Sequence, residues 1–522
     1  CVSLPFAPCA PHHTRHPPPA VASATMLLPT LIIVATLASL LWLCVFSWRA
    51  KVQRGIPFAR GCNQFFFGHT VKLIQLVKSG RIFDFFLEET AYQKYNMYQI
   101  SCLGSQILVT CNPEHIEYMF GPGFEDFAKG DIAKDTWKPL LGYGIFTADG
   151  EDWKEMRKVS SYLFSTSSLK NHMTSVFLKH SSMVLDHLRA VPSGQSIDIQ
   201  ALLQRYTFDS ICTIAFGLPV DSLNGNKDDV QFQEAYDAAQ SIVTGRFFKG
   251  SFWKLESMLG IGEERELPKH IAVVDNYLYK IVDDRLAQIR LTDGEDQRGD
   301  MLSLYIAFGK KKGKQFDRKF LRDMVTHFII AGRDTTSAAT MWLLYELSKN
   351  PQHESRLMQE IQTFSEEGIS YEAIGKMDYL RAMFYETLRL HPSVPVEARF
   401  SLHDTYLEPG HIFVHKDTFV NFPIIAMGQN PALWGEDAAE FRPERWLEGG
   451  KFRDRAEKEY PVFNVKPRSC LGKRMAELES AVMLCSLLKE VRLRVKSGFQ
   501  PRYMMGAILF SQNGMLMDVE RR

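Results

Sequence analysis

The sequence contains none of the clustered cysteines that mark many metal-binding proteins. Its nine cysteines are scattered over 522 residues with no Cys-x-x-Cys pair. That pattern argues against a zinc ribbon and a disulfide framework, and it fits a reducing compartment. No His-Glu-x-x-His motif occurs, so a zinc hydrolase of that type is disfavoured.

The sequence also has no excess of charge and no internal repeat. Lys and Arg number 61 against 60 Asp and Glu, a formal net charge of +1, which gives no electrostatic basis for binding nucleic acid. The absence of a repeat at solenoid periods excludes a stacked-repeat architecture. The chain does have a hydrophobic content of 45%, including 36 Phe, which is enough for a large core.

The N-terminal part is expected to anchor the protein in a membrane. Residues 1–25 are rich in Pro, His and Ala, and we expect an upstream extension or a disordered leader there, with Met26 as the start. Residues 26–48 include no charged residue and have about the length that crosses a bilayer. Basic residues follow at once, which places the downstream side in the cytoplasm. A cleaved signal peptide is the alternative.

These features predict a single-pass protein of the endoplasmic reticulum membrane whose folded domain faces the cytosol. Residues 26–48 form the expected transmembrane anchor, residues 49–69 a linker, and residues 70–522 the folded domain. Within that domain the pattern is mainly helical, with helical periodicity dominating from Lys170 to Lys280.

A few short segments predict a small β region. Met97–Thr110 alternates between apolar and polar residues around a Gly-Ser pair, which is typical of two strands joined by a turn. Asn112 follows as a candidate cap of a helix. Near the C-terminus, Tyr503–Val519 is expected to form a hairpin that turns at Asn513-Gly514.

One long helical pattern runs from Asp317 to Asn350 and would span about 50 Å. Its middle holds Ala331-Gly332-Arg333-Asp334-Thr335-Thr336, and a glycine with two threonines is a poor helix-forming combination. Their position predicts a local opening of the helix that has a function. The alternative is an ordinary helix that tolerates weak residues.

Another helical pattern, Tyr379–Leu390, carries Glu386 and Arg389 three residues apart, so they share a helix face and can pair. Such pairs are common on protein surfaces, and this one carries no function by itself. His391-Pro392 ends the pattern.

A single cysteine, Cys470, lies in a proline-containing loop directly before a helical pattern that runs to Leu488. The N–H groups and dipole of a helix N-terminus favour an anion. We therefore expect a lowered thiol pKa and a thiolate that can bind metal. A buried apolar cysteine beside a helix is the alternative.

Taken in order, these stretches resemble cytochrome P-450 from about Gly55 to the C-terminus. The resemblance is carried by Ala331-Gly332-x-Asp334-Thr335-Thr336, Glu386-x-x-Arg389, Pro443-Glu444-Arg445 and Phe463…Arg468-x-Cys470-x-Gly472. A closer resemblance is to the plant- and algal-type long-chain fatty-acid omega-hydroxylases. It is carried by Ala331–Thr336, Tyr385–Pro392, Trp434–Asp437, Phe441–Leu447 and Cys470–Lys473.

The resemblance implies a cytochrome P-450 fold with haem b (heme b, iron protoporphyrin IX) and Cys470 as the proximal iron ligand. It implies that Phe463 borders the haem. It also implies cationic or aromatic contacts to the haem propionates from Arg399, Arg468, Trp153 and Arg157. For the last two, the alternative is a pair of ordinary surface residues on a helix.

On the other face of the haem, the resemblance implies that Gly332 leaves room for oxygen. Asp334 and Thr335 correspond to an acid–alcohol pair that delivers protons. Glu386, Arg389 and Arg445 are implied to form a structural network. The implied borders of the substrate pocket are Val394–Glu397, Tyr143–Phe146 and Ala507–Leu509.

The implied activity is hydroxylation of a lipophilic substrate, a long-chain fatty acid, with electrons from NADPH through a reductase. One alternative is a haem-thiolate isomerase or dehydratase acting on lipid hydroperoxides, against which the Asp334–Thr335 pair argues. Another is a non-catalytic haem binder. That alternative rests on Lys466, which stands where the family usually has a glycine that can adopt conformations other residues resist.

Overall fold

The structure is a computed structural model in which the chain divides into two units, Cys1–Val52 and Gln53–Arg522. The residues that it describes are Thr36, Ser39, 55–61, 68–92, 97–102, 105–192, 194–250, 252–291, 299–313 and 316–522. The predicted leader and, apart from Thr36 and Ser39, the predicted anchor lie outside them. Within the described residues, no helix is both long and apolar enough to cross a membrane.

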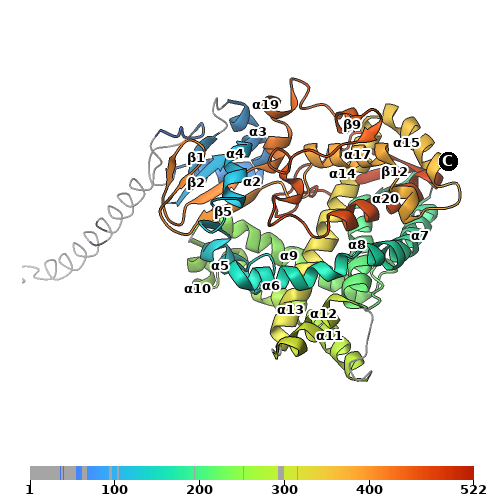
Figure 1. Ribbon diagram of the computed structural model, residues 1–522, viewed down its shortest axis with the longest axis horizontal. Coiled ribbons are helices and arrows are strands. Elements are labelled where there is room, and N and C mark those ends of the chain that lie inside the picture. The colour runs from blue at the N-terminus through green and yellow to red at the C-terminus, as the bar shows by residue number, and fades with distance from the viewer. Residues whose placement is uncertain are drawn as a thin grey trace, which may run out of the picture. The chain divides into compact units, whose positions relative to one another are not determined.

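The larger unit is mainly helical, as predicted, and most of its helices are labelled in Figure 1. They are α2 (Thr70–Lys78), α3 (Ile82–Tyr92), α4 (Pro113–Phe120), α5 (Gly130–Leu141), α6 (Gly150–Ser161), α7 (Thr174–Ala190), α8 (Ile199–Phe216), α9 (Lys227–Lys249), α10 (Phe252–Leu259), α11 (Leu267–Leu291), α12 (Met301–Lys312), α13 (Arg318–Ile329), α14 (Thr335–Lys349), α15 (Gln352–Phe364), α16 (Tyr371–Ile374), α17 (Asp378–Leu390), α18 (Ile424–Gly428), α19 (Pro431–Trp434) and α20 (Lys473–Glu490).

The strands form one mixed sheet of five and three smaller antiparallel sheets. The five-stranded sheet has the order β1 (Met97–Cys102), β2 (Ser105–Thr110), β8 (Phe419–Phe422), β5 (Glu397–Ser401) and β3 (Phe127–Ala128). Only its β2–β8 pair is parallel. The smaller sheets are β11 (Val491–Val495) with β12 (Leu516–Arg521) and β4 (Ser196–Asp198), β6 (Thr405–Leu407) with β7 (Ile412–Val414), and β9 (Leu447–Glu448) with β10 (Lys451–Phe452).

Two of the three short-range predictions are confirmed and one is wrong. Met97 pairs with Thr110 in the β1–β2 hairpin, and the Asn112 side chain accepts a hydrogen bond from Glu114 N at 3.0 Å as the cap of α4. The predicted tail hairpin does not form. Its second half, β12, pairs with β11 and β4 instead, and Tyr503–Ser511 is the isolated bridge within the predicted segment.

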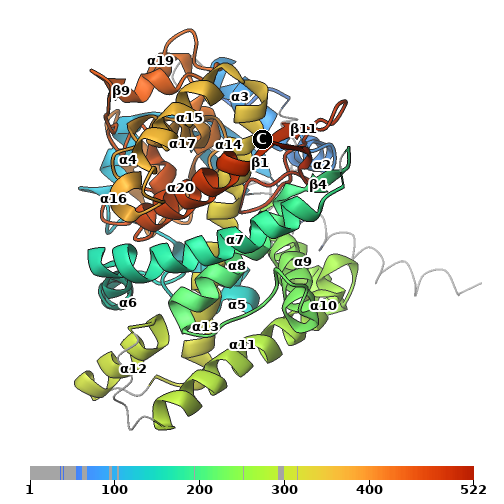
Figure 2. The same cartoon turned by 90° about the vertical axis from the view of Figure 1, so that its right-hand side faces the viewer.

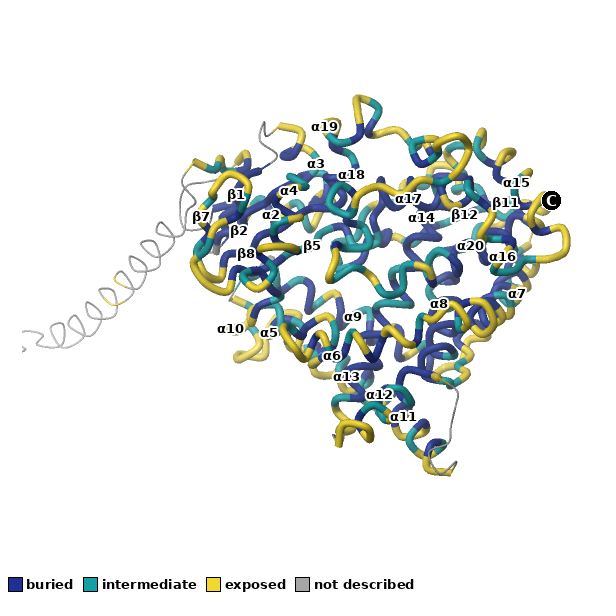
Figure 3. Tube along the Cα trace, viewed as in Figure 1, coloured by how far each residue is buried: buried dark blue, intermediate teal, exposed yellow. Residues whose placement is uncertain are grey.

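The central helix pair, α13 and α14, runs through the middle of the larger unit in both views (Figures 1 and 2). α8, α17 and α20 all pack against α14. Figure 3 shows these helices mostly in dark blue, and it shows α10 and the free ends of α11 and α12 exposed. A separate apolar core lies between the five-stranded sheet and α2 to α4.

The predicted opening in the long helix is confirmed as a π-turn, η5 (Ile330–Asp334), between α13 and α14. Its carbonyls are satisfied by side-chain hydroxyls, because Thr207 and Ser337 both donate to Arg333 O, at 2.7 and 2.8 Å. Gly332 lets α8 approach closely, since a Cβ there would lie 2.5 Å from a side-chain atom of Ile211. The residues of low helix propensity therefore lie where the regular hydrogen bonding of the helix is interrupted.

The cap of α4 gives a test of the fold. Asn112→Ala should lower the free energy of unfolding by about 1 kcal/mol, because an N–H group in the first turn of α4 loses its partner. Urea unfolding followed by circular dichroism would measure the change. Asn171→Ala is the control, since that exposed amide reaches only Ser167 at 3.4 Å and should change stability little. Equal effects of the two substitutions would contradict the capping role.

Candidate functional site

A cavity of about 260 Å³ lies between the Cys470 loop and the π-turn. Nearly all of the site residues predicted from the sequence contribute to its wall, although they come from distant parts of the chain. They are Trp153, Arg157, Gly332, Thr335, Arg399, Phe463, Arg468 and Cys470. Asp334 is the exception.

The Cys470 loop is held closed by its own backbone. Cys470 N donates to Phe463 O at 2.7 Å, and Asn464 takes a left-handed backbone conformation with φ of 59°. The helix α20 begins at Lys473, after Gly472 as its cap. The exposed surface of Cys470 belongs to the cavity that the residue lines.

The predicted lowering of the thiol pKa is wrong for this arrangement of protein atoms. Burial raises the pKa of the Cys470 thiol, and this effect outweighs the backbone N–H groups of Gly472 and Lys473 and the charge of Arg157, which lower it. The terminus of α20 thus acts in the expected direction, but the apolar surroundings dominate.

Cationic side chains gather at one edge of the cavity. The Arg468 guanidinium lies 4.0 Å from the centre of the Trp153 ring and donates through Nη2 to Asp149 Oδ1 at 2.8 Å. Arg399 Nη1 donates to Glu397 Oε1 at 2.8 Å. Burial and the nearby Arg399 charge lower the pKa of Arg468 to about 10, so Arg468 remains a cation at neutral pH.

Lys129 is a cation of this edge that the sequence did not point to. Its Nζ lies 2.8 Å from Glu397 Oε1, and burial lowers its pKa to about 8. Although burial raises the pKa of Glu397, the charges of Lys129 and Arg399 lower it to about 2. Glu397 therefore carries a negative charge between two buried cations.

On the opposite wall, Gly332 of the π-turn and Thr335, the first residue of α14, line the cavity. Asp334 does not line it. Asp334 Oδ1 accepts from Arg333 Nη1 at 2.8 Å, and Arg333 also binds Asp237 of α9. Burial raises the pKa of Asp334. The Thr335 hydroxyl donates to Ala331 O at 2.5 Å, so the predicted acid and alcohol are each bonded to other groups.

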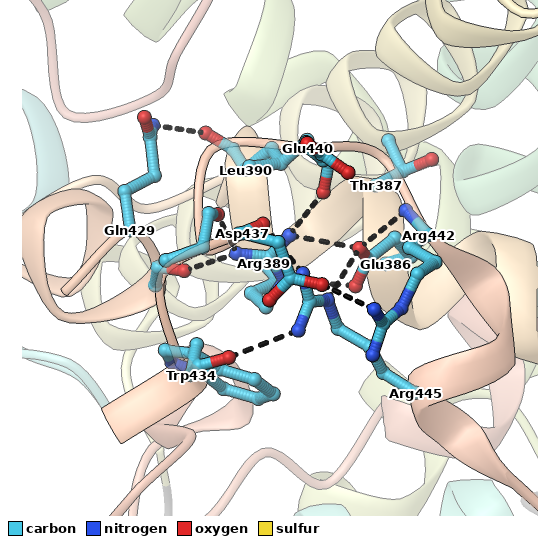
Figure 4. Close-up of polar contacts among 12 residues, drawn as sticks. Glu386, Thr387, Arg389, Leu390, Gln429, Trp434, Asp437, Glu440, Arg442 and Arg445 are labelled. Carbon is cyan, nitrogen blue, oxygen red and sulfur yellow. Dashed lines mark hydrogen bonds and ion pairs between the residues drawn. The ribbon is translucent and has the colours of Figure 1, made fainter. Parts of the chain in front are cut away.

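Glu386 and Arg389 form a fully buried ion pair, shown in Figure 4. Arg389 Nε and Nη2 each donate to a Glu386 oxygen at 2.8 Å. The same carboxylate accepts from Arg442 N at 2.7 Å and Trp446 Nε1 at 3.0 Å, and Arg445 lies 3.4 Å away. Arg389 also donates to three backbone carbonyls, those of Gly428, Ala438 and Glu440.

A second cavity, of about 330 Å³, adjoins the first and is mainly apolar. The two share Ala331, Thr335 and Val394 among their lining residues. Each predicted border segment of the substrate pocket contributes to the second cavity, through Phe146, Val394, Val396, Glu397, Ala507 and Ile508.

Comparison with known proteins decides the family. The family model described as Cytochrome P450 matches residues 62–517. The chain belongs to the cytochrome P450 family. It is therefore a haem-dependent monooxygenase, and the predicted P450 fold, mostly helical with a small sheet region, is confirmed.

Curated relatives of this P450 span most of its length. Cytochrome P450 704C1 of Pinus taeda is 32% identical over 85% of this chain and 89% of the relative. Cytochrome P450 86B1 of Arabidopsis thaliana is 33% identical over 79% and 77%, and Cytochrome P450 94A1 of Vicia sativa is 34% identical over 75% and 76%. A crystal structure of the cytochrome P450DA heme domain shares the fold, with a TM-score of 0.76, 19% identity and coverage of 90% and 98%.

The residues of the first cavity fit a P450 haem. Arg399 Nη2 and Arg468 Nε are buried N–H donors without a partner among the described residues, and anionic propionates would supply one. The Cys470 thiol lines the same cavity and would ligate iron as thiolate. Thiolate-ligated haem iron supplies the activation of dioxygen.

The buried cluster around Glu386 gives a second test. Glu386→Ala should lower the free energy of unfolding by roughly 3–5 kcal/mol, because Arg389 loses its carboxylate inside the protein. Urea unfolding and the haem content of the purified protein would both report it. Glu444→Ala is the matched control, because Glu444 lies between Arg442 and Arg445 and forms an exposed ion pair with Arg356. Similar losses for the two variants would show that burial is not the cause.

Proposed function

We propose that this cytochrome P450 hydroxylates a long-chain fatty acid or a similar lipid at or near its methyl end (omega-hydroxylation). Electrons would come from NADPH through a reductase. The observation that carries the proposal is the apolar second cavity, which meets the haem cavity at Ala331 and Thr335 of the central helix. Aromatic and aliphatic side chains line it, among them Phe83, Phe86, Trp137, Phe247, Phe400 and Ile508.

The apolar composition of this lining suits a hydrocarbon chain. Apolar walls stabilise such a chain because they remove its surface from water, worth about 0.8 kcal/mol for each buried CH₂ group. A chain lying in the second cavity with one end at Thr335 would present its terminal carbons to the haem cavity. The sequence motifs that resemble fatty-acid omega-hydroxylases support the same substrate class.

Within the site we propose distinct roles for its residues. Cys470 ligates the iron, and Arg399, Arg468 and Arg157 bind and orient the propionates. Trp153 and Phe463 support this assembly, since Trp153 stacks on Arg468 and Phe463 O holds Cys470 N.

On the other wall, Gly332 lines the haem cavity, and its lack of a side chain makes room for Ile211 of α8. We propose that Thr335 presents a hydroxyl to the cavity and that Asp334 supplies protons to it. For this, the Thr335 hydroxyl must turn away from Ala331 O and Asp334 must loosen its contact with Arg333.

We further propose an endoplasmic reticulum membrane location with the catalytic domain, residues 70–522, in the cytosol. The support is the uncharged run at 26–48 and the basic residues directly after it.

The function is tested by supplying the purified protein with a reductase, NADPH and a panel of fatty acids, alkanes and sterols. Products are identified by mass spectrometry, and we expect oxygen incorporation near the methyl end of the fatty acids. Turnover of a fatty-acid hydroperoxide without NADPH, with no NADPH-dependent product, would instead identify an isomerase or dehydratase. Haem binding without either activity would identify a non-catalytic haem binder.

The iron ligand has its own test. Cys470→Ala should abolish the carbon monoxide-shifted Soret band of the reduced protein, because the only proposed thiolate ligand is gone. Cys485→Ala is the control, since that buried cysteine lies on α20, which follows the Cys470 loop, and contacts Met377. It should leave the band in place. A shifted band that survives Cys470→Ala would disprove the assignment.

A further inference from the structure

Two polar side chains in the wall of the second cavity have no role in the function proposed above. They are Asn421 of β8 and Thr244 of α9, and both line that cavity but not the haem cavity. Asn421 is 5% exposed and Thr244 is 6% exposed. Asn421 Oδ1 and Thr244 Oγ1 have no hydrogen-bond partner among the described residues. Because a buried polar atom without a partner costs free energy, a ligand that supplies the partner is stabilised here.

Other polar side chains that line the same cavity do have partners. Lys129 Nζ lies 2.8 Å from a carboxylate oxygen of Glu397. The Thr335 hydroxyl donates to a backbone carbonyl of the π-turn, and the Thr147 hydroxyl donates to Gly142 O at 3.1 Å. These groups are satisfied within the protein. The two unpartnered atoms therefore differ from their polar neighbours in the wall.

Asn421 occupies a position on the sheet that would suit an apolar residue. Successive side chains of a strand point to opposite faces. In β8, Phe419 and Asn421 line the cavity, whereas Val420 and Phe422 belong to the apolar core on the other face of the sheet. Ala398, which pairs with Asn421 across β5, also lines the cavity. An amide at this position is thus surrounded by apolar residues on its own face.

Thr244 differs from buried threonines in other helices of this protein. Thr326, Thr340 and Thr387 each donate to the carbonyl four residues earlier in the chain, at 2.9 to 3.0 Å. Such a bond satisfies a hydroxyl inside a helix. Within the described part of the chain, the Thr244 hydroxyl has no bond of this kind. It is therefore available to a ligand in the cavity.

α9 and β8 approach each other beside these two side chains. Phe247 follows Thr244 by three residues on α9, and Phe419 precedes Asn421 by two residues on β8, so each ring shares a face of its element with the polar residue. The two rings are stacked, with their centres 6.1 Å apart. Thr244 and Asn421 consequently belong to the same part of the cavity wall.

A hydroxyl group is the ligand chemistry that suits both atoms. The amide oxygen of Asn421 accepts hydrogen bonds, and the Thr244 hydroxyl donates and accepts. A carboxylate has no proton to donate to the amide oxygen, and the charge of Lys129, the cation that lines this cavity, is already met by Glu397. A hydrocarbon leaves both atoms unpaired. An alcohol both donates and accepts, so it can bond to either residue.

We infer that Asn421 and Thr244 determine substrate specificity by binding the hydroxyl group of a hydroxylated fatty acid. Because both residues lie outside the haem cavity, the hydroxyl group that they hold is separate from the carbon that is oxidised. This inference rests on the proposed function, in which a lipid chain occupies the second cavity. It narrows the substrate class from long-chain fatty acids to those that already carry a hydroxyl group within the chain.

The test compares the binding of hexadecanoic acid with that of its in-chain monohydroxy derivatives to the holoenzyme. The Kd is read from the ligand-induced change in the Soret band. We expect the derivative whose hydroxyl reaches the two residues to bind at least about ten-fold more tightly than the parent acid, since a site that hydrogen-bonds a hydroxyl discriminates against ligands that lack it. Asn421→Leu and Thr244→Val should each lower this preference several-fold.

Thr147→Val is the matched control, because Thr147 lines the same cavity and its hydroxyl already has a partner. This variant should lose stability and keep the wild-type preference for the hydroxylated lipid. Asn421→Leu, in contrast, should leave the Tm of the ligand-free holoenzyme unchanged or raise it, because leucine removes an unpaired amide oxygen from an apolar face. A lower Tm in Asn421→Leu would assign Asn421 a structural role and overturn the inference.

Equal binding of hexadecanoic acid and all of its hydroxy derivatives to the wild type would also overturn it, since water alone would then satisfy the two atoms. Failure of the proposed function has a different result, in which no lipid of the series changes the Soret band or is oxidised. Lipids that bind and are oxidised near the methyl end, with no preference for a hydroxyl group, would support the proposed function and disprove the role of Asn421 and Thr244.

Discussion

The burial of the Glu386 carboxylate is the constraint on which the sulfur loop depends. A charge with no exposed surface must be met by cations and N–H groups of fixed position, and here they come from α17 itself and from the segment around Arg442 and Trp446. That requirement fixes α17. Tyr385 on the same helix then binds Glu477 of α20 through its hydroxyl at 2.5 Å, and its ring lies 6.1 Å from that of Phe463. Contacts from α17, which this buried charge holds in place, therefore reach both sides of the Cys470 loop.

The wall of the haem cavity that faces the Cys470 loop is stabilised by hydroxyl groups and not by a buried ion pair. The π-turn disrupts the regular pattern of helix hydrogen bonds, and the cost of unsatisfied carbonyls is removed by hydroxyls, of which Thr207 and Ser337 on Arg333 O are examples. Gly332 brings α8 close, and Thr335 and Thr336 both reach the cavity. One wall is thus held in place by buried charges, and the other by hydroxyl groups that bond its backbone carbonyls.

The sequence predicted features whose cause is local. The Asn112 cap, the β1–β2 pairing and the Glu386–Arg389 pair each depend on residues close in the sequence, so pattern and spacing suffice. The ion pair of Lys129 with Glu397 joins residues 268 positions apart, and no short-range signal marks it. The tail hairpin was wrong because β11 and β4 are better partners for β12.

The same distinction explains the error on the Cys470 pKa. The effect of a helix terminus can be inferred from the sequence, whereas desolvation depends on how closely the cavity walls approach the sulfur. Eight residues predicted from the family resemblance line one cavity, but a sequence motif does not specify which hydrogen bonds its residues form. Asp334 is bonded to Arg333 and Thr335 to Ala331 O, and both bonds depend on the local geometry of the π-turn.

The backbone conformation of the Cys470 loop explains how Lys466 can stand where the family usually has glycine. Glycine at this position would matter if the backbone were left-handed, but Lys466 is not among the described residues with positive φ, and the left-handed residue of the loop is Asn464. The Asn464 side chain donates to Glu397 at 3.1 Å, which ties the loop to the cationic edge of the cavity. Lys466 N donates to Glu457 at 2.9 Å, and its side chain is exposed. Lys466 in place of glycine therefore adds a positive charge to the surface. The left-handed backbone conformation in the loop that positions the sulfur is supplied by Asn464.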